Sequence, residues 1–197
     1  MTEREPPIEI LSFGESLVDF LPDRRGVSLA DVESFRKVVG GAPTNMALGV
    51  AQLGCDAALM GKIGEDAFGD FVLDSLDRAG VDTRGMSRTD RAQTGLTFVT
   101  LDEDGDRSFL FYRDPSADML LRTDDIVPQV VEEARIFQVG SNLLTDPAVR
   151  EATEHAIDLA RTSQTLLSVD PNIRPHLWES TDLLRDVILE QAESADI

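Results

Sequence analysis

Two consecutive glycines followed by an asparagine form the stretch of this sequence best suited to chemistry. Gly40 and Gly41 allow a tight turn and a close approach of the backbone to a ligand. Pro43 suits the first turn of a helix, and a helix N-terminus offers free N–H groups and the positive end of the helix dipole. Asn45 can both donate and accept hydrogen bonds there. The residues alone leave two interpretations open, a ligand-binding helix N-terminus and a capped surface turn.

Two other places carry polar groups where a ligand could use them. Asp19 lies inside the apolar segment 15–20, where a carboxylate is unfavourable unless it faces a ligand or solvent. Asn172 and Arg174 follow the apolar run 166–169 in a turn that contains proline. Ligands of parallel α/β proteins bind at the carboxyl ends of the strands, so we expect these groups near one such edge.

The elements that must position these groups are strands and helices, which can be told apart by the spacing of their apolar residues. Apolar runs predict strands at 8–13, 15–20, 35–39, 57–63, 136–139 and 166–169. Helical spacing predicts helices after the glycine turn and at 66–79, 124–133, 146–161 and 181–195. The first of these helices has an apolar body of Met46, Leu48, Val50, Ala51 and Leu53. We expect it to end at Gly54, the second to end at Gly80, and Thr145 to cap the helix 146–161. The alternation predicts an α/β fold with a mostly parallel sheet and helices on both faces.

Two further strands interrupt this alternation. Residues 94–101 and 107–113 are typical of strands, and Asp102–Asp106 joins them as a hairpin loop with an Asp-Gly turn. We expect these strands to form a β flap beside the main sheet.

Composition excludes several classes of protein. The net charge is −19, from 37 acidic and 18 basic residues, which disfavours nucleic acid and anionic membranes as partners. No apolar run reaches the roughly 20 residues of a membrane span, and the N-terminus lacks the apolar core of a signal peptide. A cytoplasmic location is therefore expected. We interpret Cys55, the one cysteine, as a small core residue and Trp178 as a packing anchor.

The glycine stretch also carries a resemblance to a known family. Gly40-Gly41-Ala42-Pro43-x-Asn45-x-Ala47, followed by Gly54 and Gly64, resembles the N-terminal signature of the PfkB (ribokinase-like) sugar kinases. The segments 12–20, 111–121 and 170–174 are similar to fructokinases within that family, and the resemblance covers residues 8–197. It implies that residues 1–197 are the N-terminal portion of a single kinase domain. The implied fold is a three-layer α/β sandwich with a small β-sheet lid, whose strands lie near 15–20, 33–39 and 94–113.

The resemblance also implies a site. ATP and Mg2+ are the implied cofactors, with magnesium held through the phosphates and no metal ligand in this chain. The family places sugar-binding groups at Asp19, Gly40, Gly41 and Asn45, lid contacts to the sugar at Phe111 and Arg113, a nucleotide contact at Asn172, and a phosphate-stabilising cation at Arg174. From the residues alone, a plain ion pair with an acidic neighbour stays open for both arginines.

The implied substrate is fructose, and the nearest alternative is 2-keto-3-deoxygluconate. The run Asp-Pro-Ser-Ala-Asp after Arg113 favours fructose. Relatives often pair two subunits through the lid, so the resemblance also predicts a homodimer.

One motif of the family does not occur. Members carry their catalytic aspartate in a Gly-Ala-Gly-Asp motif near the C-terminus, and this sequence lacks that motif. We therefore expect the general base, the anion hole and much of the nucleotide pocket to be absent from these residues. A second hypothesis follows, that the chain is a catalytically inactive fragment which at most binds a sugar weakly.

Overall fold

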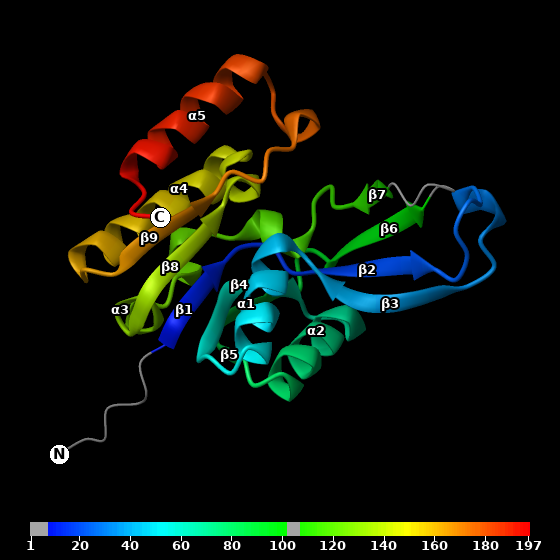
Figure 1. Cartoon of the computed structure of the whole chain (residues 1–197), viewed down its shortest axis with the longest axis horizontal. Coiled ribbons are helices and arrows are strands. Elements are labelled where there is room, and N and C mark those ends of the chain that lie inside the picture. Colours follow the sequence, from blue (N-terminus) through cyan, green and yellow to red (C-terminus); the bar gives the residue numbers. More distant parts are fainter. Residues whose placement is uncertain (1–7, 102–106) are drawn as a thin grey trace.

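The computed structural model describes residues 8–101 and 107–197 of the chain (Figure 1). The expected hairpin loop Asp102–Asp106 and the N-terminal segment Met1–Pro7 lie outside the described residues. Within those residues, no helix is both long enough and apolar enough to cross a membrane.

A five-stranded parallel sheet forms the centre of the larger part. Its strand order is β5 (Asp82–Thr89), β4 (Ala57–Gly64), β1 (Ile8–Phe13), β8 (Ala134–Gly140) and β9 (Leu166–Asp170). The strands in the middle are almost wholly buried, as expected of a parallel sheet covered on both faces. Their carboxyl ends therefore meet at one edge.

Helices cover both faces and give three layers (Figure 1). On one face, α1 (Ala42–Gln52) and α2 (Ala67–Arg78) pack on one apolar cluster. On the other, α3 (Pro128–Glu132) and α4 (Pro147–Thr162) pack on a second cluster. The last helix, α5 (Thr181–Ser194), packs on a small third cluster that includes Trp178. Trp178 is thus a packing anchor, as predicted.

A second sheet extends to one side of the first (Figure 1). Its order is β3 (Phe35–Gly40), β2 (Leu17–Pro22), β6 (Gly95–Leu101) and β7 (Arg107–Tyr112). Only the β2–β6 pair is parallel. Phe20 stacks on Phe98 with ring centroids 4.9 Å apart and meets Phe68 of α2 edge-on, which ties this sheet to the larger part.

Asp66 makes a second tie between the two parts. Its carboxylate caps α2 by accepting from the backbone N–H groups of Phe68 and Gly69 at 2.9 and 2.8 Å. It also accepts from the backbone N and the hydroxyl of Thr94, just before β6, at 2.7 and 3.0 Å. Burial raises the pKa of Asp66, but these hydrogen bonds outweigh burial and hold it below its ordinary value.

The glycine turn forms as its residues predict. Gly41 is the N-cap of α1 with φ of 101°, Pro43 lies in the first turn, and Gly54 follows the helix with φ of 85°. The expected apolar body was partly wrong, because Met46 and Leu53 are 40% and 84% exposed and only the other members face the core.

Several predicted boundaries shift. The strand expected at 15–20 is β2, which starts at Leu17 because residues 15 and 16 turn between the sheets. The helix expected at 124–133 is a 3-10 turn at Thr123–Asp125 followed by the short α3, since Pro128 starts a new helix. β5 was not predicted at all.

Two single-residue expectations were also wrong. Asp146, not Thr145, caps α4, since its carboxylate accepts from the backbone N–H groups of the first turn. Cys55 is exposed rather than in the core, because it lies in the surface turn between α1 and β4.

Candidate functional site

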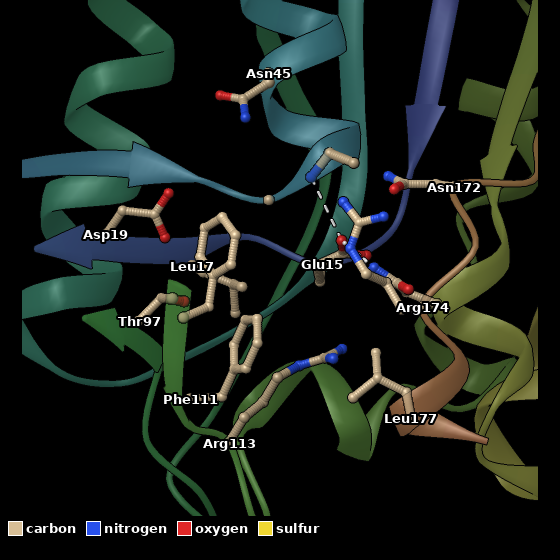
Figure 2. A pocket seen from close by; sticks show the side chains of 14 residues that line it. Glu15, Leu17, Asp19, Asn45, Thr97, Phe111, Arg113, Asn172, Arg174 and Leu177 are labelled. Carbon is tan, nitrogen blue, oxygen red and sulfur yellow. Dashed lines mark hydrogen bonds between the residues drawn. The ribbon is translucent and has the colours of Figure 1, made fainter. Parts of the chain in front are cut away.

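A cavity of about 240 Å3 lies between the small sheet and the carboxyl ends of β1, β8 and β9. Seven of the eight residues singled out from the sequence line it: Asp19, Gly41, Asn45, Phe111, Arg113, Asn172 and Arg174. Asp19 and Phe111 approach from the small sheet, and Asn172 and Arg174 come from the segment after β9 on the opposite side (Figure 2). Groups separated by up to 155 residues in the sequence therefore share one space.

Gly40, the eighth predicted residue, does not line the cavity but lies against the side chain of Asp19. A Cβ atom at Gly40 would lie 2.3 Å from the carboxylate carbon of Asp19. A Cβ atom at Gly41 would lie 2.4 Å from the carbonyl oxygen of Glu15, and the φ of 101° at Gly41 already disfavours any other residue. The two glycines thus let the start of α1 pack directly against the cavity wall.

The start of α1 contributes Asn45 to the cavity. Its side chain projects from the first turn of the helix, and the N-cap is Gly41 (Figure 2). The alternative that Asn45 serves as the helix cap therefore does not apply.

Arg113 is held on the small-sheet side of the cavity by an ion pair. Its Nε donates to Oδ2 of Asp118 at 2.8 Å, and its Nη2 donates to the same oxygen. The Arg113 side chain is 15% exposed and that of Asp118 is 1% exposed. Burial lowers the pKa of Arg113, but the Asp118 carboxylate outweighs burial and the pKa lies above its ordinary value. Arg113 is thus both an ion-pair partner and a cavity-lining residue.

Glu15 is a buried acid in the cavity wall that the sequence did not single out. Its Oε1 accepts from the side-chain amide of Asn142 at 3.2 Å and from the backbone N of Ala42 at 3.4 Å. Burial raises the pKa of Glu15, and the charge of Arg113 offsets only part of this effect. A carboxyl group in this state carries a proton at higher pH than an ordinary glutamate.

Three unsatisfied polar atoms surround the cavity. Among the described residues, Oε2 of Glu15, Oδ1 of Asn142 and Oγ1 of Thr97 are buried without a hydrogen-bond partner, and all three residues line the cavity. A buried polar atom without a hydrogen bond lowers the stability of the fold. These three atoms therefore indicate a place where a polar ligand could supply the missing hydrogen bonds.

Arg174 lies on the opposite side of the cavity in a different environment. Its side chain is exposed, and its Nη1 donates to the carbonyl oxygen of Ile173 at 3.2 Å. Among the described residues, no acid forms a salt bridge with Arg174. Asn172, beside it, adopts a positive φ of 31°, and its backbone N is held by the Asp170 carboxylate at 3.0 Å.

The described part of the chain contains no group of three histidine, cysteine or acidic side chains placed to hold a metal ion. The functional groups of the cavity are hydrogen-bonding groups, the buried acid Glu15, the half-buried acid Asp19 and two arginines.

Comparison with known proteins identifies a family. Residues 8–197 match the model of the pfkB family carbohydrate kinases. The probable fructokinase-3 of Arabidopsis thaliana is 46% identical over 189 residues, covering 95% of this chain and 54% of that protein. The chain thus spans little more than half the length of this relative.

Solved structures give the same result. The crystal structure of a fructokinase from Xylella fastidiosa superposes with a TM-score of 0.86 at 39% identity, covering 96% of this chain and 58% of that one. The structure of fructokinase with bound ATP from the same organism gives a TM-score of 0.84 at 38% identity, covering 96% and 60%. The expected three-layer fold with a small second sheet is confirmed.

Proposed function

Since this chain belongs to the pfkB family of carbohydrate kinases, we propose that the protein transfers a phosphoryl group from ATP to a hydroxyl group of fructose. The observation that carries the proposal is the convergence of seven predicted site residues on one cavity. Relatives at 46% and 39% identity that are named as fructokinases support the choice of sugar.

The cavity supplies the hydrogen bonds that a sugar needs. Asp19 offers a carboxylate, Asn45 offers an amide, and the buried Oγ1 of Thr97 has no partner among the described residues. Sugar hydroxyl groups both donate and accept, so they complement such a mixture. Phe111 supplies an apolar surface for the carbon face of the ring.

The opposite side of the cavity suits the phosphate groups. We assign Arg174 to the transferred phosphate and Asn172 to the nucleotide, because Arg174 is the cavity-lining cation that lies outside any described salt bridge. Such catalysis depends on positioning and on neutralising charge. A structure of a relative with bound ATP supports ATP as the donor. We propose that magnesium reaches this site on the ATP phosphates.

We further propose a homodimer through the small sheet. The edge strand β7 exposes four large apolar side chains, Phe109, Leu110, Phe111 and Tyr112. An apolar edge strand of this kind favours pairing with another chain. Light scattering tests this proposal, and a monomer mass would contradict it.

The decisive experiment starts from the gene product. The intact mass of the protein expressed from its native gene is measured first, because the sequence lacks the family's Gly-Ala-Gly-Asp motif. ADP release is then followed with ATP, Mg2+ and a panel of sugars. Turnover of fructose above all other sugars supports the proposal. Stronger turnover of 2-keto-3-deoxygluconate would overturn the choice of sugar, and a 21.6 kDa product without kinase activity would favour an inactive sugar-binding fragment.

A further inference from the structure

The positive charge of Arg113 is already compensated before any ligand arrives. Two of its N–H groups donate to one oxygen of Asp118. A guanidinium has five N–H donors. Because Arg113 lines the cavity, its remaining donors are available to a ligand bound there. Arg113 therefore offers hydrogen bonds to the cavity without offering a net charge.

Three features hold Asp118 in position to pair with Arg113: a side-chain hydrogen bond, a backbone anchor and burial. Its other oxygen, Oδ1, accepts a hydrogen bond from the hydroxyl group of Ser116. The segment itself is anchored by the backbone N of Ala117, which donates to the carbonyl oxygen of Gln93 at 2.8 Å. The carboxylate is also 99% shielded from solvent, so water does not replace either hydrogen bond. Arg113 could turn to a competing anion only by giving up both of its hydrogen bonds to a carboxylate that is held in place.

Further acids reinforce this balance on the same side of the cavity. Glu15 is buried and acts on Arg113 through its charge when it is ionised. Asp19 lines the cavity from the neighbouring strand β2. A ligand carboxylate on this side would face acidic groups and a guanidinium whose charge is satisfied. Its water shell would be lost without a net positive charge to replace it.

We propose that Asp118 is a specificity-determining residue that restricts the sugar to one without a carboxylate, by neutralising Arg113 at the cavity wall. This inference rests on the proposed function and deepens it. A neutral sugar hydrogen-bonds to the spare N–H groups of Arg113, whereas a sugar acid meets a site without free positive charge. Specificity of this type comes from rejecting the wrong ligand as much as from binding the right one.

The test compares binding of fructose and of 2-keto-3-deoxygluconate by calorimetry on the native gene product, alongside kcat/KM for each sugar. For the wild type we expect the sugar acid to bind at least tenfold more weakly than fructose. In Asp118→Asn, Arg113 regains a free charge, so we expect the preference to shift toward the acid by at least tenfold.

A matched control separates this effect from the general loss of one negative charge. Asp114→Asn makes the same chemical change four residues earlier, at an exposed position. We expect it to leave the ratio of the two affinities within twofold of the wild type. An equal shift in both variants would overturn the proposal.

A second variant covers the case in which Asp118→Asn does not fold. Replacing both partners, as Arg113→Gln with Asp118→Asn, removes the ion pair without leaving an unpaired buried charge. Because the cavity wall stays neutral, we expect the affinity for the acid to remain within threefold of the wild type, while fructose binds more weakly because it loses the N–H groups of Arg113. A selective loss of acid binding by tenfold or more in this variant would show that Arg113 holds a carboxylate in the wild type, and would overturn the proposal.

The outcomes also separate this inference from the proposed function. A wild type that binds the acid as tightly as fructose refutes the role of Asp118 and leaves a sugar kinase in place. A protein that binds neither sugar and phosphorylates none refutes the proposed function and the inference with it.

Discussion

Arg113 and Arg174 line the same cavity but lie in opposite environments. Arg113 is 15% exposed and shares its charge with the buried Asp118, while Arg174 is exposed and contacts a backbone carbonyl. One arginine is largely buried and paired with a carboxylate, and the other is exposed and lies outside any described salt bridge. The cavity is thus divided into a side that suits neutral hydrogen-bonding groups and a side that suits anions.

This division has a simple physical basis. A guanidinium placed in a buried wall must be paired, because an isolated buried charge is expensive. A guanidinium at the rim keeps its hydration and can exchange water for a phosphate at little cost. An arginine therefore has a different role in the wall, where it is paired, than at the rim, where it can bind an anion.

The largest expected difference between the two arginines is in stability. We expect Arg113→Ala to lower the free energy of unfolding by about 3–5 kcal/mol, because Asp118 would remain as an uncompensated buried charge. We expect Arg174→Ala to change it by no more than about 0.5 kcal/mol, since its side chain is exposed. Urea denaturation of both variants measures this, and equal losses would contradict the division.

The next difference concerns catalysis and rests on the proposed function. We expect Arg174→Gln to lower kcat about 100-fold with little change in KM for the sugar, because its charge acts on the transferred phosphate. Steady-state kinetics on the native gene product measures both constants. Arg185→Gln, at an arginine whose side chain is 67% exposed on α5, serves as the control. A rise in sugar KM at unchanged kcat would place Arg174 at the sugar instead.

The third prediction concerns the pH dependence of the Arg113 side. Burial raises the pKa of Glu15, so the native state binds more protons than the unfolded state, and stability falls as pH rises from the ordinary glutamate range through the raised pKa. The groups that face Glu15 are Arg113, Asp118 and Asn142. Each unit of pKa difference is worth about 1.4 kcal/mol.

We expect Glu15→Gln to remove this loss of stability, because an amide does not ionise. Unfolding free energies measured in urea between pH 4 and pH 8 should then fall less steeply for the variant than for the wild type. Parallel curves for the two proteins would mean that the pKa of Glu15 is the same in the native and unfolded states, and would contradict the effect of burial on this carboxyl group.

The smallest expected effect is that of salt. Raising ionic strength from 0.1 to 1 M shortens the screening length from about 10 Å to about 3 Å. We expect ATP binding, which depends on the exposed Arg174, to weaken several-fold beyond the part due to ATP itself, as judged against Arg174→Gln. Fructose binding should change less than twofold. Calorimetry at both salt concentrations provides the measurement.

Much of the fold was accessible from the sequence because it depends on local patterns. The glycine turn, the helix after it and the core strands follow from residue type and period. β5 was not predicted from the sequence, because Asp82–Thr89 is a polar edge strand that contains Gly85 and has no apolar run. An edge strand of this kind is stabilised by its backbone hydrogen bonds to the neighbouring strand rather than by an apolar pattern, and the sequence does not show which strand is its neighbour.

The candidate site was predicted unevenly for a related reason. Asp19 and Asn45 stand out because they occur in apolar or glycine-rich surroundings, and the resemblance assigns them roles. Glu15 and Asn142 each lie shortly after a core strand, and nothing local links them across 127 positions. Only the meeting of β1 and β8 at one sheet edge brings them together.

The four hydrogen bonds of Asp66 have a mechanical consequence. They fix the backbone of Thr94, at the root of β6, to the first turn of α2, so this point cannot slide relative to the larger part. A rotation of the small sheet about such a fixed point displaces each atom in proportion to its distance from that point. The described residues of β6 and β7 that lie farthest from Thr94 would then be displaced most, and those near Thr94 least. One carboxylate thereby holds the start of β6 and the start of α2 at a fixed separation.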